Sequence, residues 1–441
     1  MNQALLDELI EWLRIPSVST GEPDREGLER AATWAAERVR AAGGTAELVR
    51  IEGGNPLVVG ELRAVREDAP TVLIYGHYDV QGPEPLDGWA SPPFEPTIRG
   101  GRLYARGAAD DKGNFYPLLR VACELARAGE LPVHVRVLIE GEEEVGGNSV
   151  AAWLRQDERG ADVAIVFDGG MADADTPAIT VGLRGIVQLN VVVRVGQRDL
   201  HSGMYGGSVL NALHVVHDMI AAVRPGPDGR VREELRAGIE EPPVAELESW
   251  KRLKPGAEVL AEVGGRPLDA NAARDYYPRN GADASLDVNH VEAGAPRTVV
   301  PAEARMTLSL RLAPRQRLEE IEPVLVKLLR DAAPPGAEVE MSGHHGEPAL
   351  FDVESPALQL AKRALDRATG MQTAFVRTGG SIPVVADMAA AGIPAIVSGF
   401  TLPDDAFHAP NESYELRSLE LGEAAARELL RALADLPTGG A

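Results

Sequence analysis

Five side chains of the types that bind divalent metals stand at or near the ends of apolar, strand-like runs of this sequence. They are two imidazoles and three carboxylates: His77, Asp110, Glu144, Asp168 and His408. A carboxylate can bridge two cations while each histidine completes one of them, so the set suits a pair of Zn- or Mn-class ions. Two cations that share a carboxylate and a water make that water a nucleophile. The pattern therefore predicts a hydrolytic enzyme.

Three of these positions follow directly after near-continuous apolar runs, which cover residues 72–75, 133–139 and 163–167. Each run passes into polar or glycine-rich sequence, as is typical of buried strands in an α/β sheet. Ligands of such sheets lie at the carboxyl ends of the strands. We therefore expect His77, Asp168 and the neighbouring acids Glu143 and Glu144 at one edge of a single sheet.

The pattern changes near Arg184. Strands are predicted at 187–195, 285–288, 305–312 and 338–341, and helices at 208–223 and 318–329. This βαββαβ order is the signature of a ferredoxin-like α+β domain. Its segment 225–281 is rich in Pro, Gly and charge, and no elements are assigned to it.

After about residue 346 the α/β alternation returns. Helices are predicted at 356–368, 382–391 and 418–433, and strands at 373–376 and 395–398. His408 lies in this last part, so the ligand set closes only if both outer segments build one domain. We expect a catalytic domain made of residues 1–184 and 347–441, interrupted by an inserted domain at 185–346.

The composition of the chain limits the classes of partner that we expect it to bind. A chain of 441 residues with 44% hydrophobic content can form two cores. The net charge of −23 argues against nucleic acid or an anionic membrane as partner, which leaves small molecules. Cys123 is the single cysteine, residues 1–14 lack the basic lead of an export signal, and no apolar run has membrane-spanning length. We expect a soluble cytoplasmic protein.

The candidate ligands lie in motifs that resemble those of the M20 metallopeptidase family, the group of aminoacylase, carboxypeptidase G2 and carnosinase, and most of all its dipeptidase branch. The motifs are WLRIPSVS (12–19), YGHYDVQ (75–81), DGW with PF (87–89, 93–94), LYARGAADDKG (103–113), IEGEEEVG (139–146), FDG (167–169), RDLHSGMYGG (198–207), RTVVPA (297–302), RTGGSIPV (377–384) and HAPNE (408–412). The resemblance covers nearly the whole chain and is weakest across 225–281. It implies a zinc-peptidase-like catalytic domain with an inserted lid and dimerisation domain.

The resemblance also implies a role for each candidate ligand. Asp110 would bridge two divalent ions, with His77 and Asp168 on one ion and Glu144 and His408 on the other. The family has a cis peptide after the bridging aspartate, here between Asp110 and Asp111.

The general base aligns with Glu143, and Asp79 aligns with an acid that steers the site. The run of three glutamates permits a slip of one residue, because Glu142 precedes the pair.

Further positions matching the family would bind substrate. His201 would come from the inserted domain of a partner subunit and hold the oxyanion, which requires a homodimer and a closed lid. Thr298, Arg311 and Ser381 match positions that hold the C-terminal side of the substrate, and the Arg311 fork suits a free carboxylate. The loop at 291–297 is shorter than in carnosinase-like members. Dipeptides are the expected substrates.

Ordinary structural roles compete with these assignments. Asp110 and Asp111 could cap a helix, Asp168 could open a turn, and Arg311 could pair with a surface acid. For the whole chain, the alternatives are an N-acyl-amino-acid amidohydrolase or carboxypeptidase on the same fold, and a catalytically silent metal-binding scaffold. A dipeptidase needs an acid for the substrate ammonium and an acyl hydrolase needs an apolar pocket, and the sequence leaves this choice open.

Overall fold

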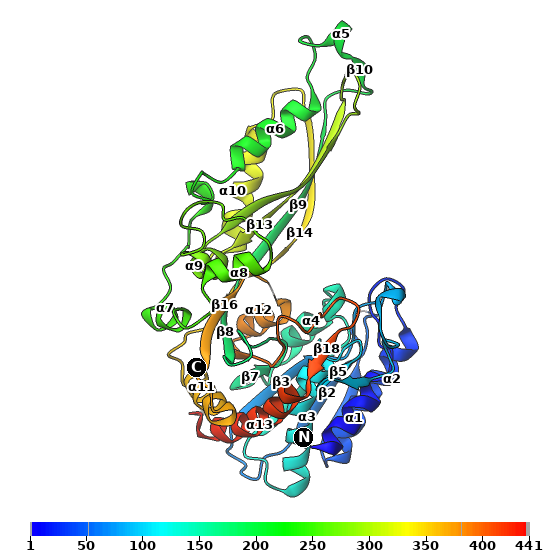
Figure 1. The fold of residues 1–441 in the computed structure, drawn as a ribbon, viewed down its shortest axis with the longest axis vertical. Coiled ribbons are helices and arrows are strands. Elements are labelled where there is room, and N and C mark those ends of the chain that lie inside the picture. The colour runs from blue at the N-terminus through cyan, green and yellow to red at the C-terminus, as the bar shows by residue number, and fades with distance from the viewer. Residues whose placement is uncertain (1, 52, 381, 438–441) are drawn as a thin grey trace. The chain divides into compact units, whose positions relative to one another are not determined.

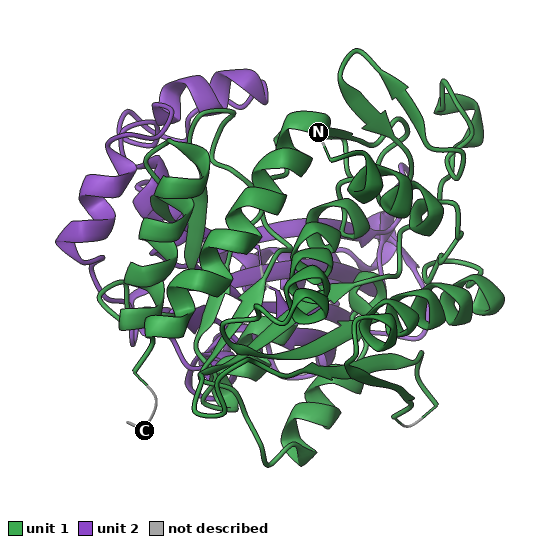
Figure 2. Cartoon of the chain, turned by 90° about the horizontal axis from the view of Figure 1, so that it is seen from below, with its two compact units in different colours: residues 1–181, 351–375, 384–441 green, residues 182–350, 376–383 purple. Residues whose placement is uncertain are grey.

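The computed structural model describes residues 2–51, 53–380 and 382–437, and the chain divides into two compact units (Figure 2). Unit 1 contains Met1–Val181, Phe351–Phe375 and Val384–Ala441, and unit 2 contains Gly182–Leu350 and Val376–Pro383. The domain boundaries expected from the sequence, 1–184, 185–346 and 347–441, stay a prediction.

A mixed sheet forms the centre of unit 1 (Figure 1). Its strands run in the order β1 (Thr45–Val49), β2 (Leu57–Leu62), β6 (His134–Glu140), β3 (Thr71–His77), β7 (Val163–Val166), β17 (Ala395–Val397) and β8 (Ala178–Leu183). β3 is parallel to both β6 and β7, and β17 is parallel to β7. The four residues Val72 to Tyr75 of β3 are fully buried, which explains why this strand reads as a continuous apolar run.

Helices cover this sheet. α3 (Lys112–Ala128) packs on β3 and β2, and its neighbours are α1 (Gln3–Leu13), α2 (Arg25–Ala41) and α13 (Leu416–Ala432). The leucines of α1 at helical spacing are buried, with Trp12 stacked on Trp34 at 5.3 Å. α3 ends at Ala128 and is capped by Gly129, whose φ of 68° is the left-handed conformation that closes many helices. α4 (Ser149–Gln156), α11 (Pro356–Thr369) and α12 (Pro383–Ala390) complete the set of longer helices.

A small sheet in unit 1 joins segments that are distant in sequence. β18 (Ser413–Glu415) pairs with β5 (Arg102–Tyr104), which pairs with β4 (Thr97–Arg99). The guanidinium of Arg102 contacts Asp405 and also lies 3.2 Å from carboxylate oxygens of Asp404 and Glu415. The C-terminal segment is thereby fixed beside the loop that precedes α3.

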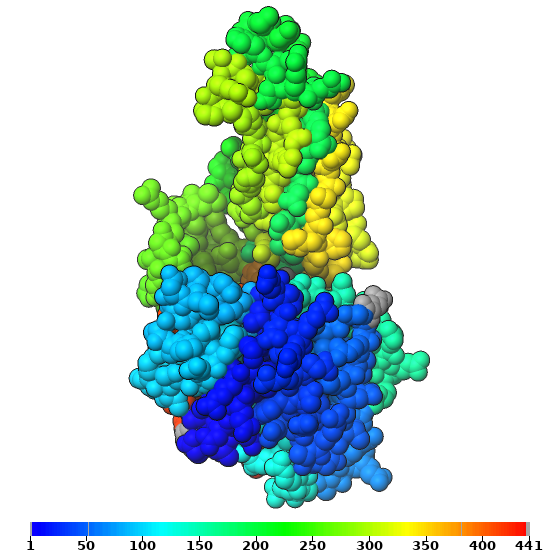
Figure 3. Space-filling model, turned by 90° about the vertical axis from the view of Figure 1, so that its right-hand side faces the viewer, coloured from blue at the N-terminus to red at the C-terminus, as the bar shows by residue number. Residues whose placement is uncertain are grey.

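Unit 2 contains a four-stranded antiparallel sheet in the order β11 (Ser285–Ala293), β13 (Glu303–Leu312), β9 (Gly185–Arg194) and β14 (Glu338–Gly346). α6 (Ala212–Val223) and α10 (Leu318–Asp331) pack on it. β14 forms one edge and is largely exposed (yellow in Figure 3). The βαββαβ order predicted from the sequence for a separate α+β domain is confirmed, and its sheet is antiparallel.

The unassigned segment 225–281 folds into short helices. They are a 3-10 turn at Glu233–Leu235, α7 (Val244–Trp250), α8 (Gly256–Glu262) and α9 (Tyr276–Gly281). The buried carboxylate of Glu246 in α7 accepts two hydrogen bonds from Arg377, at 2.6 and 2.9 Å. Among the described residues, no helix is long and apolar enough to cross a membrane.

A substitution at Gly76 tests the packing of α3 on β3. A Cβ atom at this position would lie 2.3 Å from Cγ of Phe115, whose ring is fully buried and cannot move aside. Gly76→Ala should therefore lower the free energy of unfolding in urea by about 1–3 kcal/mol, the usual cost of overpacking. Phe115→Leu in the same chain should recover part of the loss.

The matched control for this prediction is Gly346→Ala at the end of β14, where the nearest atom would be an ordinary contact at 3.5 Å. Its free energy of unfolding should stay within about 0.5 kcal/mol of the wild type. Equal effects of the two substitutions would contradict the argument.

Candidate metal centre

The structure brings the five ligand-type residues of unit 1 together. His77 is the last residue of β3, Glu144 lies in the 3-10 turn Glu143–Val145 after β6, and Asp168 follows β7. Asp110 lies in the loop before α3, and His408 in the loop before β18. β3 lies between β6 and β7 and is parallel to both, so the carboxyl ends of the three strands meet at one edge of the sheet, as expected.

Asp110 occupies the middle of the cluster. Its Oδ1 lies 3.0 Å from Nε2 of His77, and its Oδ2 lies 2.9 Å from Nε2 of His408. Oδ1 of Asp168 is 4.0 Å from the His77 nitrogen, and Oε2 of Glu144 is 3.1 Å from the His408 nitrogen. Two triads of potential ligand atoms result, each within 4.8 Å, and they share Asp110.

The donor set fits two divalent ions of the Zn or Mn class. Each triad offers one imidazole nitrogen and two carboxylates, which is the mixture these ions accept. The other ring nitrogen of His77, Nδ1, lies 3.0 Å from the backbone oxygen of Asp79. That contact orients the ring so that Nε2 faces Asp110.

The electrostatics of the cluster favour added positive charge. Burial lowers the pKa of His77, but the hydrogen bonds to Asp110 and Asp79 and the charges of Asp168 and Asp110 together raise that pKa well above its usual value. The hydrogen bond to Asp110 raises the pKa of His408 to about 10. Burial raises the pKa of Asp168, and it raises the pKa of Glu143 to about 7. Protons or metal cations would therefore stabilise this arrangement.

The three successive glutamates have different surroundings. Oε1 of Glu142 accepts a hydrogen bond from the backbone N–H of Asn55 at 3.0 Å, so this residue holds a neighbouring loop. Glu144 contacts His408 and accepts a hydrogen bond from Gln81 at 2.8 Å. Within the described part of the chain, the carboxylate of Glu143 makes no hydrogen bond and stays available at the edge of the cluster.

Asp79 connects two of the segments that carry candidate ligands. Its buried Oδ2 accepts hydrogen bonds from Oγ of Ser19 at 2.7 Å and from the backbone N–H of Glu144 at 3.2 Å. Its Oδ1 lies 3.4 Å from Nδ1 of His77. The peptide between Asp110 and Asp111 is cis, as the resemblance implied.

Two supporting residues were missed in the sequence. Asn114 in α3 donates to the backbone oxygen of Gly169 at 2.9 Å and accepts from the N–H of Phe400 at 2.9 Å, so it holds the loop after Asp168. Lys112 is fully buried and donates to backbone oxygens at the end of α1. A polar residue on the apolar stripe of a helix was the available signal for both.

The remaining candidates belong to unit 2, apart from Ser381, which lies outside the described residues. His201 is exposed in β10 (Leu200–His201), which pairs with β12 (Val299–Val300). The backbone oxygen of Thr298 accepts from the N–H of Ser202 at 3.0 Å, so Thr298 and His201 lie together.

Arg311 lies near the other end of the sheet of unit 2, paired with Ile186 and Ser285. The start of β13 at Glu303 is eight residues away, roughly 26 Å along a strand. His201 and Arg311 of one chain are therefore too far apart to contact the same dipeptide.

Sequence reasoning also missed Arg184, which supports the surroundings of Arg311. Arg184 is 7% exposed, and its Nη1 donates to Oγ of Ser285 at 3.0 Å. Ser285 is directly opposite Arg311 in the sheet. Burial lowers the pKa of Arg184 to about 10, and the charge of Arg311 adds to this effect. Neither guanidinium makes an ion pair with an acid within the described residues, so a carboxylate would be well accommodated.

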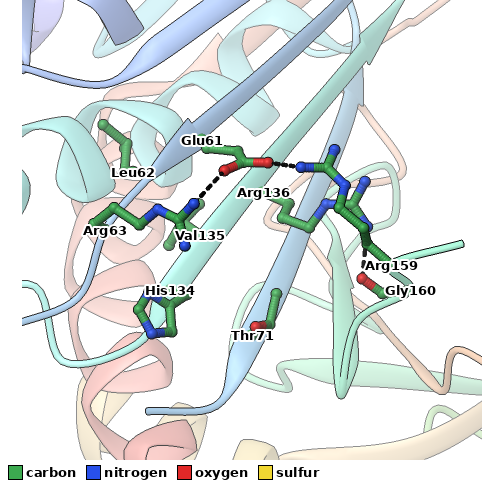
Figure 4. Close-up of a pocket in the computed structure, with 9 residues that line it drawn as sticks. All are labelled: Glu61, Leu62, Arg63, Thr71, His134, Val135, Arg136, Arg159 and Gly160. Carbon is green, nitrogen blue, oxygen red and sulfur yellow. Dashed lines mark hydrogen bonds and ion pairs between the residues drawn. The ribbon is translucent and has the colours of Figure 1, made fainter. Parts of the chain in front are cut away.

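A cavity of about 150 Å³ in unit 1 lies at the opposite, amino ends of β3 and β6 (Figure 4). Glu61 pairs there with Arg63 and Arg159, and Arg136 pairs with Asp157 outside the lining. Each of these three arginines has a carboxylate partner, and Glu61 is the one carboxylate among the residues that line the cavity. Among the described residues, both triads of potential metal ligands lie at the carboxyl ends of the strands and not in this cavity.

Comparison with known proteins identifies the class of protein. The chain belongs to peptidase family M20/M25/M40, because the model of this family matches residues 73–432. It is 29% identical over 398 residues to the cysteinylglycine-S-conjugate dipeptidase of Corynebacterium striatum, covering 87% of this chain and 84% of that protein. It is also 29% identical over 360 residues to the Cys-Gly metallodipeptidase dug1 of Schizosaccharomyces pombe, covering 75% and 72%.

A solved structure agrees. The M20 family metallo-carboxypeptidase Sso-CP2 from Sulfolobus solfataricus aligns over 99% of this chain and 100% of that chain, with a TM-score of 0.86 and 28% identity. The family, the fold class and the metallopeptidase class predicted from the sequence are thereby confirmed.

The pKa values predict how the metal-free protein responds to pH. The pKa of Glu143 is about 7 in the folded protein, whereas its ordinary value is 4.5. The fold is therefore destabilised as the pH rises from 4.5 through about 7, because a buried carboxyl must ionise. The stabilisation from protonated His408 is lost as pH rises through about 10. Both effects have the same sign, so the thermal midpoint of protein stripped of metal by a chelator should fall across this range.

Glu143→Gln should flatten the part of this fall below about pH 7, since the group that titrates is removed. Saturating Zn²⁺ or Mn²⁺ should raise the midpoint more at high pH than at low pH, because cations compete with protons for the ligands. A midpoint of the metal-free wild type that rises with pH in a differential scanning experiment would refute this account.

Proposed function

We propose that this chain hydrolyses the amide bond of dipeptides that have a free C-terminal carboxylate, with two divalent ions, Zn²⁺ or Mn²⁺, bound per chain. The observation that supports this most directly is the pair of ligand triads that share Asp110. His77 and Asp168 would complete one ion, and Glu144 and His408 the other.

The acid–base chemistry is assigned to Glu143. When bound, the two ions would lower the pKa of water and polarise the scissile carbonyl. The carboxylate of Glu143 makes neither a hydrogen bond nor an ion pair in the described residues, and burial raises its pKa to about 7, near the value that suits a general base at neutral pH. It takes a proton from the water and delivers it to the leaving amine. Asp79 keeps the ring of His77 oriented during these steps.

Arg311 binds the substrate carboxylate in this proposal. Its guanidinium and that of Arg184 lie near Ser285 without an acid partner in the described residues, so an anionic ligand would be compensated there. Ser381 is assigned to the same end of the substrate by the family resemblance. A terminal carboxylate is common to dipeptides and to the substrates of carboxypeptidases.

His201 is assigned to the active site of a second copy of the chain, with Thr298 beside it. Its distance along the sheet from Arg311 separates the two roles within one chain. Apolar side chains are exposed around it, with Met204 73%, Tyr205 42% and Leu213 41% accessible. Such a group of exposed apolar residues is typical of a protein interface, which supports a homodimer through unit 2.

Two other functions are distinguishable. The similarity to a metallo-carboxypeptidase favours, as a second candidate, hydrolysis of longer peptides or N-acyl amino acids at the same centre. A silent scaffold would need neither a complete pair of triads nor an unpartnered glutamate beside them. A cytoplasmic location completes the proposal and is supported by Cys123, which is buried as a free thiol.

The proposal is tested by a turnover screen of dipeptides, N-acyl amino acids, succinyl-diamino acids and tripeptides, with Zn²⁺ and Mn²⁺ supplied separately. Unblocked dipeptides should be hydrolysed, and amidation of their C-terminus should abolish turnover, because the carboxylate contact is lost. Faster turnover of N-acyl amino acids or tripeptides would favour the second candidate, and no turnover of any substrate would favour the scaffold.

Substitution of adjacent glutamates separates the base from the ligand. Glu143→Gln should keep the fold and two ions per chain, yet lose about 10²–10⁴-fold or more in kcat, since the general base is removed. Glu144→Ala should instead bind one ion fewer. Metal analysis and turnover of the two variants check this. Loss of metal from Glu143→Gln with retention by Glu144→Ala would shift the assignment by one residue.

Complementation tests the shared active site. His201→Ala and Glu143→Ala should each be nearly inactive, and mixing them under conditions that exchange subunits should restore roughly a quarter of wild-type activity. About half of the dimers are then mixed, and each has one complete site of two. A mixture no more active than its two parents, with exchange demonstrated, would make His201 a local residue.

A further inference from the structure

The loop that carries His408 has an unusual backbone. Three of its non-glycine residues adopt the left-handed conformation, Ala406 at φ 55°, His408 at 61° and Asn411 at 64°. Residues other than glycine rarely adopt this backbone conformation, so it persists only where surrounding contacts hold it. Some interaction in unit 1 must therefore fix this loop.

The buried carboxylate of Glu412, at the end of this loop, is fully hydrogen-bonded. Oε2 accepts from Nη1 of Arg106 at 2.8 Å and from the N–H of Gly107 at 3.0 Å. Oε1 accepts from the N–H of Ala109 at 2.8 Å and from the N–H of Asp110 at 3.1 Å. Three of the four donors are backbone groups of the loop that presents Asp110.

Glu412 thus joins two loops that are about 300 residues apart in sequence. The backbone adds to this link, because the N–H of Ala105 donates to the oxygen of Glu412 at 3.2 Å. Arg106 is 1% exposed and also donates to the oxygen of Gly82 at 3.2 Å, so the buried charge of Glu412 is balanced by a cation that is itself held.

We propose that Glu412 is a positioning residue that sets the geometry of Asp110 and His408 together, so that both metal ions depend on it. This inference rests on the proposed function, since it takes Asp110 and His408 as metal ligands. Asp110 contributes to both triads, and a displacement of its backbone therefore alters both sites.

Glu412→Gln is a sharp test because the side chain keeps its size. The amide NH₂ must replace one of the two oxygens, and each oxygen now accepts from two donors. In either orientation two donors face an NH₂ group, and Arg106 loses its anionic partner. Changes of this kind beside a metal site typically weaken metal binding about 10–100-fold.

The experiment titrates metal-free protein with Zn²⁺ and with Mn²⁺ against a chromophoric chelator, with circular dichroism to confirm folding. Glu412→Gln should weaken both ions about 10–100-fold, whereas His408→Ala should weaken mainly one. The visible absorption of Co²⁺-loaded Glu412→Gln should also differ from the wild type, because ligand geometry changes.

Glu246→Gln is the matched control. Glu246 forms a comparably buried pair with Arg377 in unit 2, with side chains 2% and 4% exposed. The same chemical change there should leave both metal constants and the Co²⁺ spectrum unchanged, even if it lowers the thermal midpoint. If Glu412→Gln fails to fold, Glu412→Asp retains the charge with a shorter reach and should weaken both ions less.

The outcomes separate this inference from the proposed function. Folded Glu412→Gln, or Glu412→Asp in its place, with wild-type constants for both ions overturns the inference and leaves the dinuclear proposal intact. Equal weakening in Glu246→Gln also overturns it, since the effect would then be one of general stability. Fewer than two ions on the wild-type chain would overturn the proposed function and this inference together.

Discussion

The structure of unit 1 depends on the placement of one carboxylate, Asp110, between two imidazoles. Bringing several buried acids to one point is costly unless positive charge accompanies them. The raised pKa values of His77 and Asp168 reflect this cost, because the imidazole retains its proton and the acid resists losing its own. A centre of this kind is therefore stabilised by bound cations. The surrounding fold is rigid enough to hold the like charges close together.

That rigidity comes from two kinds of support. Parallel strands bring His77, Asp168 and Glu144 to one edge of the sheet through backbone pairing alone. Asp110 and His408 lie in loops, and side chains hold them: Glu412 joins the two loops directly, and Arg102 contacts three acids around the second. The strand order alone would therefore leave the centre incomplete.

The sequence predicted the strand-end ligands because a buried parallel strand and the acid that follows it are adjacent in the chain. It also predicted the βαββαβ order of unit 2, since periodicity reports local structure. The helices of 225–281 were not predicted because they are short and rich in Pro and Gly, so the sequence shows no hydrophobic periodicity there. Glu412 and Arg184 escaped it because their roles depend on partners remote in sequence, and a single charged residue gives no sign of burial.

The order of the segments has a consequence for biosynthesis. Unit 1 is built from the two outer parts of the chain, and residues 182–350 of unit 2 intervene. The entropic cost of closing a loop grows only slowly with its length, so this long insertion costs little more free energy than a shorter one would. On the ribosome, however, a nascent chain that ends before His408 has one triad complete and the other open. The residues of the first triad all precede unit 2, whereas the second triad can form only after residues 182–350 and His408 have been synthesised.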